Sequence, residues 1–131
     1  MNESKIDKMI QAVDALKDES FDWKTFNCGF AAATIAQAYC GKDYAENFRP
    51  FCEGKLTAMR IIKKAGGLEF IMDDLGFEEI PVSFARRCDC VLSSGKAASL
   101  GIVYDGRRAV FPTQFGLGFI DVSQCQKAWR V

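Results

Sequence analysis

The chain changes its hydrophobic pattern once, near Pro81, and that change most constrains what it can fold into. Before it, apolar residues recur every three or four positions, which is the spacing of helices that bury one face. After it, short apolar runs are separated by turn residues, and Asp105-Gly106 lies between two of these runs. An Asp-Gly pair in that setting is typical of a tight β-hairpin. Helices followed by hairpin-linked strands predict an α+β domain.

The part before Pro81 is expected to contain helices over about residues 5–17, 28–39, 56–65 and 68–75. The first begins at Ser4, which with Asp7 three positions later is typical of a capped helix start. The second contains a run of alanines from residue 31 to residue 33. Side chains this small predict close packing against a flat surface, such as a sheet.

The part after Pro81 is expected to contain strands at about residues 91–92, 100–104, 107–111 and 119–122. These strands predict a small antiparallel sheet, built from about residues 89–122, on which the second helix packs. Gly116-Leu117-Gly118 is interpreted as a turn that links two strands. The apolar ending, residues 128–131, is expected to dock against the domain.

The length and composition limit the number of domains and the kinds of partner that this chain can have. A chain of 131 residues with 49% hydrophobic residues suits one domain over residues 1–131, with an N-terminal helical region at residues 1–20. The formal net charge is zero, which gives no electrostatic reason to expect nucleic acid or an anionic membrane as partner. No apolar run approaches the roughly 20 residues of a membrane span, and the polar N-terminus does not resemble a signal peptide. We therefore expect a cytoplasmic location.

The chain has six cysteines, and none is expected to form a disulfide or bind a metal. A chain without a signal peptide is an improbable disulfide scaffold. Cys88-Asp89-Cys90 is the one close pair, and its spacing is shorter than that of common zinc motifs. If Asp89 lies in a strand, both sulfurs share one face. We expect no cofactor, and most of these cysteines are interpreted as small buried hydrophobic residues.

Cys28 lies at the start of the second helix, where a catalytic cysteine is commonly held. The partial positive charge of a helix N-terminus favours thiolate over thiol. A cysteine hydrolase also needs a base beside the sulfur, most often histidine, and this chain has none. Asp89, Asp105 or a buried lysine are the alternative bases, and a carboxylate would need its pKa raised by burial.

Three motifs in this order resemble papain-like cysteine peptidases of the NlpC type. Residues 27–30 are similar to the nucleophile motif, residues 88–92 to the following strand, and residues 99–107 to the strand that carries the histidine. The resemblance covers about residues 21–131 and is closest to a branch encoded in phage and prophage tail gene clusters. The motifs that recur in that branch are similar to Phe21-Asp22-Trp23, Ala65-Gly66-Gly67-Leu68 and Ala128-Trp129-Arg130-Val131.

The resemblance implies a papain-like fold with Cys28 at the nucleophile position and Ser99 at the histidine position. Asn27 replaces the usual aspartate before the cysteine, where it can cap the helix. The position that orients the histidine falls near Phe111-Pro112, which are apolar. Ser99 cannot act as a base near neutral pH, so the resemblance implies the fold more directly than it implies catalysis.

Two further groups are candidates for binding. Trp23 could line a groove beside Cys28 with Phe21, Phe26 and Phe30, although most of these rings are expected in the core. The pairs Arg86-Arg87 and Arg107-Arg108 could bind an anion, and solvated loop charges are the ordinary alternative.

Three functions follow as hypotheses. The first is a non-enzymatic, degenerate papain-like domain that is a structural or assembly component of a phage or prophage tail. Its partners would be other tail or hub proteins, and it would reside in the host cytoplasm or in the virion tail. The second is a cysteine hydrolase that cleaves cell-wall peptide with Cys28. The third is a small regulator from a mobile element that binds a host protein.

Overall fold

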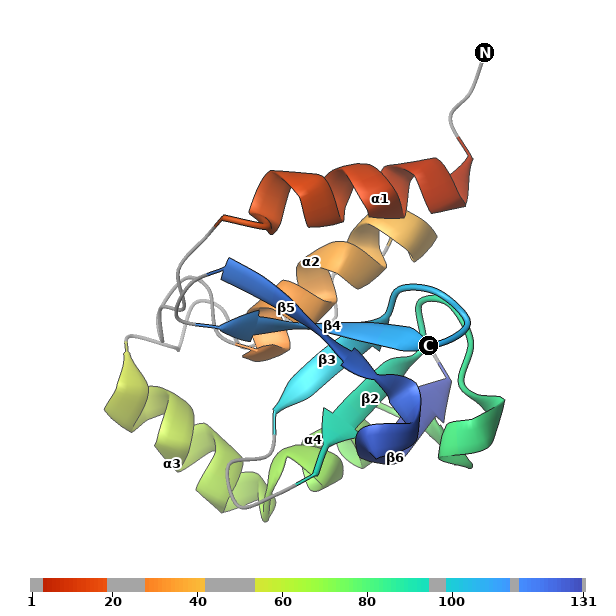
Figure 1. Cartoon of the computed structure of the whole chain (residues 1–131). Coiled ribbons are helices and arrows are strands. Elements are labelled where there is room, and N and C mark those ends of the chain that lie inside the picture. Colours follow the sequence, from red (N-terminus) through yellow and green to blue (C-terminus); the bar gives the residue numbers. More distant parts are fainter. Residues whose placement is uncertain (1–3, 19–27, 42–53, 95–98, 114–115, 131) are drawn as a thin grey trace.

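The computed structural model consists of helices followed by an antiparallel sheet, which confirms the α+β class (Figure 1). It describes residues 4–18, 28–41, 54–94, 99–113 and 116–130. The statements below concern these residues. The predicted irregular segment at residues 42–54 lies almost entirely outside them.

The predicted helices are confirmed to within one residue at each end. They are α1 (Lys5–Leu16), α2 (Cys28–Cys40), α3 (Lys55–Ala65) and α4 (Leu68–Asp74). The hydroxyl of Ser4 accepts a hydrogen bond of 3.1 Å from the backbone N–H of Asp7, so the predicted cap of α1 is present. Gly66 ends α3 with a φ of 96°, a left-handed conformation that favours glycine.

The sheet has six strands, and it is larger than the sequence predicted. The strands are β1 (Glu78–Ile80), β2 (Cys90–Ser93), β3 (Leu100–Val103), β4 (Arg108–Thr113), β5 (Gly116–Asp121) and β6 (Cys125–Arg130). Their order is β1-β6-β2-β3-β4-β5, and each adjacent pair is antiparallel. The last strand of the chain therefore lies inside the sheet, between β1 and β2.

The interpretation of Gly116-Leu117-Gly118 as a turn is wrong, because all three residues belong to β5. Gly116 has a φ of 121°, and a Cβ at this position would overlap the backbone of Lys17. The backbone N–H of Leu117 donates to the carbonyl of Lys17 at 2.9 Å. The glycine is therefore explained by a close approach between the end of α1 and the start of β5.

Asp89 does not lie in a strand, so the alternation of side chains along a strand does not apply to Cys88 and Cys90. Cys88 has a φ of 72°, and the N–H of Asp89 donates to the carbonyl of Arg86 at 2.9 Å. These residues form a tight turn before β2 begins at Cys90. The side chains of Cys88 and Cys90 nevertheless both lie in the core on the helix side of the sheet.

The sheet has a buried layer on each face. The layer on the helix side includes Met9, Ile35, Met72, Cys90, Leu100, Ile102, Val110 and Trp129. The layer on the other face includes Val91, Val103, Ala109, Phe111, Val122, Cys125 and Ala128. Successive residues of a strand alternate between the two layers, as Cys90 and Val91 do.

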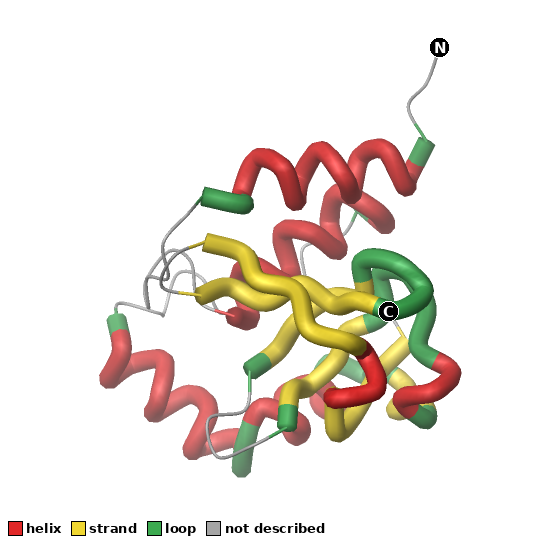
Figure 2. The backbone as a smooth tube through the Cα atoms, in the orientation of Figure 1, coloured by secondary structure: helices red, strands yellow, loops and turns green. Residues whose placement is uncertain are grey.

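The alanine-rich helix packs on the sheet as predicted. Ala32, Ile35 and Ala36 of α2 belong to the same buried layer as Ile102 of β3 and Val110 of β4. Helix α1 covers α2 in turn, and the two helices lie together on one side of the strands (Figure 2). The small side chains of α2 allow this close contact with a flat face.

Substitution of Gly101 should destabilise the fold. A Cβ on Gly101 would lie 2.6 Å from both the Phe111 ring and the carbonyl oxygen of Val110. Overpacking of this kind costs about 1–3 kcal/mol, so Gly101→Ala should lower the free energy of unfolding by that amount in urea titrations. Gly106→Ala is the matched control, because nothing lies within 4 Å of a Cβ there. Equal stability of the two variants would contradict this packing.

Candidate functional site

The residues expected around the nucleophile position fall largely outside the described part of the chain. Cys28 is the first residue of α2, as predicted, but its side chain is not among those described. Trp23 and Asn27 lie outside the described residues, so their predicted roles stay predictions. The expected proximity of Ser99 to Cys28 stays a prediction for the same reason.

Ser99, which the resemblance to NlpC-type peptidases aligns with their histidine, is half-buried immediately before β3. Its backbone N–H donates to the Ser93 hydroxyl at 2.9 Å, and its carbonyl accepts from the Ser93 N–H at 2.9 Å. These two bonds fix its backbone beside the end of β2. A serine hydroxyl in this place can donate or accept a hydrogen bond but cannot take a proton near neutral pH.

The resemblance implies that the residue orienting the histidine falls near Phe111-Pro112, and the structure places both residues in an apolar setting. Phe111 and Pro112 are buried in β4, and the Phe111 ring packs on the face of the sheet opposite the helices. Neither side chain carries a hydrogen-bonding group. If the resemblance aligns these positions correctly, Ser99, Phe111 and Pro112 cannot serve as the second and third members of a cysteine hydrolase triad.

Asp89, one candidate base, is held by contacts within the fold. Its side chain is buried, and its carboxylate accepts a hydrogen bond of 3.0 Å from the backbone N–H of Arg86. The guanidinium of Arg130 lies 3.6 Å from the same carboxylate oxygen. These contacts connect this turn to β6, so Asp89 has a structural role.

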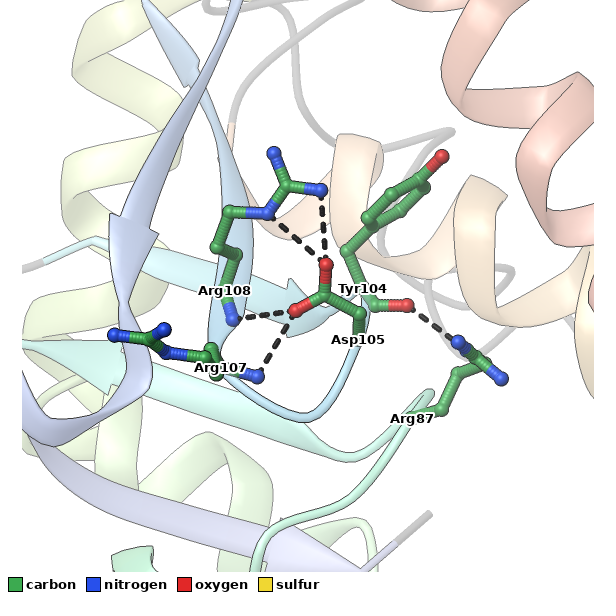
Figure 3. Close-up of polar contacts among 5 residues, drawn as sticks. All are labelled: Arg87, Tyr104, Asp105, Arg107 and Arg108. Carbon is green, nitrogen blue, oxygen red and sulfur yellow. Dashed lines mark hydrogen bonds and ion pairs between the residues drawn. The ribbon is translucent and has the colours of Figure 1, made fainter.

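Asp105, the other candidate carboxylate, organises the β3–β4 turn. One oxygen accepts hydrogen bonds from the backbone N–H groups of Arg107 and Arg108 at 2.9 and 2.8 Å. The other accepts from the Arg108 guanidinium at 3.0 and 2.8 Å (Figure 3). The backbone bond from Arg107 and the bonds from Arg108 lower the pKa of Asp105 to about 2. A carboxylate with this pKa is a poor base near pH 7.

Arg108 is also held by aromatic rings. Its guanidinium lies 5.6 Å from the centre of the Tyr104 ring and 4.8 Å from that of Phe119. The two rings meet edge to face, with centres 5.4 Å apart. Cation–π contacts add to the ion pair with Asp105, so Arg108 supports the hairpin.

The arginines considered for an anion site include Arg87 and Arg107, whose surroundings the structure describes. Arg87 donates from Nε to the carbonyl of Tyr104 at 2.9 Å. The side chain of Arg107 points away from Asp105 (Figure 3) and lines a hollow of about 450 Å³ with Asp105, Gly106, Arg108 and Asp121. Two carboxylates beside two guanidinium groups leave no excess of positive charge in this hollow.

The described cysteines are buried thiols. Cys88, Cys90 and Cys125 are not in disulfides, while Cys40 and Cys52 have side chains outside the described set. Burial, and then the charge of Asp121, raise the pKa of the Cys125 thiol, which favours the unreactive protonated form. Within the described ranges, no three side chains of the metal-binding types lie close enough to share an ion.

None of the described helices has the length and apolarity to cross a membrane.

A family model described as "Domain of unknown function (DUF6950)" matches residues 4–131. The chain belongs to the DUF6950 family. A comparison of this DUF6950 chain with curated proteins gives no match. The match extends from the N-cap of α1 through the end of β6, so the family model covers the helices and the whole sheet.

Sequence reasoning missed the ring contacts of Arg108 in this DUF6950 chain. The Asp-Gly signal located the hairpin correctly, because Asp105 and Gly106 lie between β3 and β4. The contact with Phe119 depends on the pairing of Val110 with Phe119 across β4 and β5. Because the sequence indicates a turn at residues 116–118, it does not predict the register between β4 and β5 that brings Phe119 near Arg108.

The low pKa of Asp105 gives a test of this turn. Because its folded pKa of about 2 lies below the ordinary 3.8, the ionised carboxylate stabilises the fold above about pH 4 and loses this effect as the pH falls toward 2. The free-energy difference between wild type and Asp105→Asn should shrink over the same range in urea titrations.

A direct NMR titration of the Asp105 carboxyl carbon should give the same pKa. Arg108→Gln is the matched variant, because the backbone donors remain while the guanidinium is removed. The pKa should then move part of the way toward 3.8. A wild-type carboxyl that titrates near its ordinary value would contradict the observed hydrogen bonding.

Proposed function

We propose that this DUF6950 chain is a non-catalytic, degenerate papain-like domain that serves as a structural or assembly component of a phage or prophage tail. Two observations about candidate proton acceptors carry the non-catalytic part of this proposal. The sequence has no histidine, and the carboxylate at the hairpin has a pKa of about 2. The tail role rests on the resemblance of the motifs at residues 21–23, 65–68 and 128–131 to the tail-encoded branch.

The lysines support the same proposal. A lysine acts as a base near neutral pH only when burial lowers its pKa. None of the lysines whose side chains the structure describes is buried, a set that leaves out Lys55. Lys127 lies 3.4 Å from a Glu69 carboxylate oxygen and 3.6 Å from one of Glu79, and these groups raise its pKa. Lys127 therefore keeps its proton.

The proposed partners are other tail or hub proteins, and the proposed location is the host cytoplasm, with incorporation into the virion tail. A thiol at a helix N-terminus can form a thiolate, but amide hydrolysis also needs a proton for the leaving amine. A structural role needs neither the thiolate nor this proton. Cleavage of cell-wall peptide by Cys28 is the competing activity, and the next experiment decides between the two.

The purified chain should show no turnover of peptidoglycan fragments or simple amide substrates near neutral pH. The wild type and Cys28→Ala should give the same background rate, because the chain has no histidine to take the thiol proton and protonate the leaving amine. Turnover that disappears in Cys28→Ala would establish the hydrolase instead. Site-resolved thiol alkylation across pH adds a second readout. An apparent pKa for Cys28 far below the ordinary value of about 8.5 would show a primed thiolate and contradict an inert site.

The proposed tail role is tested genetically in the phage or prophage that encodes the chain. Deletion of its gene should yield particles with defective tails, and expression of either wild type or Cys28→Ala should restore them. Gly106→Ala is the matched control and should also restore the tails, because it disturbs neither the packed core nor Cys28. Normal tails after deletion would contradict the structural role. Rescue by wild type but not by Cys28→Ala would show that the thiol is needed.

A further inference from the structure

We propose that the outward face of α3 binds the outward face of α1 of a second copy of this chain, so that copies associate head to tail. The inference stands apart from the proposed function, because it rests on two helix surfaces and holds whether or not the chain serves a phage tail. In Figure 1, α1 lies at the top of the molecule and α3 at the bottom left. The two faces of one copy are therefore too far apart to cover each other.

The outward face of α3 is apolar and basic. The other side of this helix packs against α4. Four exposed residues recur at positions i, i+3, i+4 and i+7 and so share one face: Leu56, Met59, Arg60 and Lys63. Leu56 is 74% exposed and Met59 is 49% exposed. The helix contains four basic residues and no acidic residue, so this face, the basic face, has a positive charge.

The outward face of α1 is apolar and acidic. Met9 and Val13 are buried and define the inner side of this helix. Ile10 is exposed, and it is a surface neighbour of the exposed Ile6, which precedes it by four positions. Two exposed carboxylates are also neighbours of Ile10, since Asp7 precedes it by three positions and Asp14 follows it by four. Ile6, Asp7, Ile10 and Asp14 form the acidic face.

The lysines of α1 lie to the side of this acidic face. The Lys5 ammonium is 6.0 Å from the centre of the Tyr39 ring, so it is directed toward α2. Lys8 directly follows Asp7, and adjacent residues of a helix point about 100° apart. Lys17 and Asp18, which follow the end of α1, add one charge of each sign. The two carboxylates therefore determine the charge around Ile10.

The two faces are complementary in both polarity and charge. Each has two exposed apolar side chains beside two charged ones, and the charges of the two faces have opposite signs. Contact between them buries the apolar pair of each helix against that of the other, and it places two basic groups beside two carboxylates. Apolar burial contributes affinity, while opposite charges select the partner. An anionic lipid surface would attract the basic face but repel the acidic face, whereas a second copy matches both.

The contact joins different surfaces of the two copies, so it is heterologous. A pair joined in this way keeps one unused acidic face and one unused basic face. Further copies can add at both ends until a ring closes or a filament forms. The formal net charge of zero means that no overall repulsion opposes this growth.

Sedimentation velocity over a concentration series tests the association. The wild type should pass from monomers to dimers and larger species between micromolar and submillimolar concentrations. Arg60→Glu with Lys63→Glu makes both faces acidic, and Asp7→Lys with Asp14→Lys makes both faces basic. Each double variant alone should raise the dissociation constant by at least about tenfold, because like charges then meet.

An equimolar mixture of the two double variants is the decisive sample. The acidic α3 of one variant then meets the basic α1 of the other, and their unchanged faces also match, so association should return toward that of the wild type. Arg86→Glu is the matched control, because Arg86 is exposed but lies outside both helices. Its charge reversal should leave the association unchanged.

Carbodiimide coupling of the wild type gives a readout that does not depend on the folding of a variant. This reagent joins an amine to a carboxylate that it touches. It should link Lys63 to Asp7 or Asp14, and the link should join isotope-labelled to unlabelled chains. Coupling between copies that leaves out these residues would overturn the proposed contact.

Other outcomes would overturn the proposal as well. One is a wild type that stays monomeric over the whole concentration range. Another is a mixture of the two folded double variants that does not associate. Binding of a monomeric wild type to vesicles of anionic phospholipid, with loss of binding in the Arg60→Glu and Lys63→Glu variant, would assign the basic face to a membrane instead. These results leave the turnover and gene-deletion tests of the proposed function unaffected.

Discussion

The fold depends on one row of side chains that crosses the sheet beneath the helices. Trp129, Cys90, Ile102 and Val110 come from four adjacent strands and are paired in register from one strand to the next. All four lie in the layer that receives α1, α2 and α4. The Trp129 ring is completely buried, and its N–H donates to Asp73 of α4 at 3.2 Å. Loss of this row would separate the helices from the sheet.

Polar side chains stabilise the turns next to this apolar layer. Asp89 connects the turn before β2 to Arg130 of β6, and Asp105 fixes the turn between β3 and β4. Both are carboxylates that a search for a catalytic base would select. Their partners are backbone N–H groups and arginines. At Asp105 these contacts also lower the pKa of the carboxyl, so the contacts that fix the turn make this residue a poor proton acceptor.

The sequence predicted the elements whose signals are local and missed those that depend on distant partners. Helix spacing and the Asp105-Gly106 turn are local, and both were confirmed. Strand β6 was expected only as a docked ending, because polar Gln126 and Lys127 interrupt its apolar pattern and its partners are remote in sequence. The start of α2 at Cys28 was predicted, but the contacts of Arg108 required the register of β4 and β5.

The position of β6 between β1 and β2 has a consequence for synthesis of the chain. β6 follows the other five strands in the sequence, so it is made after them and must then enter the interior of the sheet, where it forms hydrogen bonds on both sides. Until β6 has been made, β1 has no strand to pair with, and β2 presents an open edge. Trp129 arrives with the same strand, so the layer beneath the helices stays incomplete for as long. The nascent chain therefore exposes an incomplete sheet until β6 has been made, and this is the interval in which it is most open to misassembly.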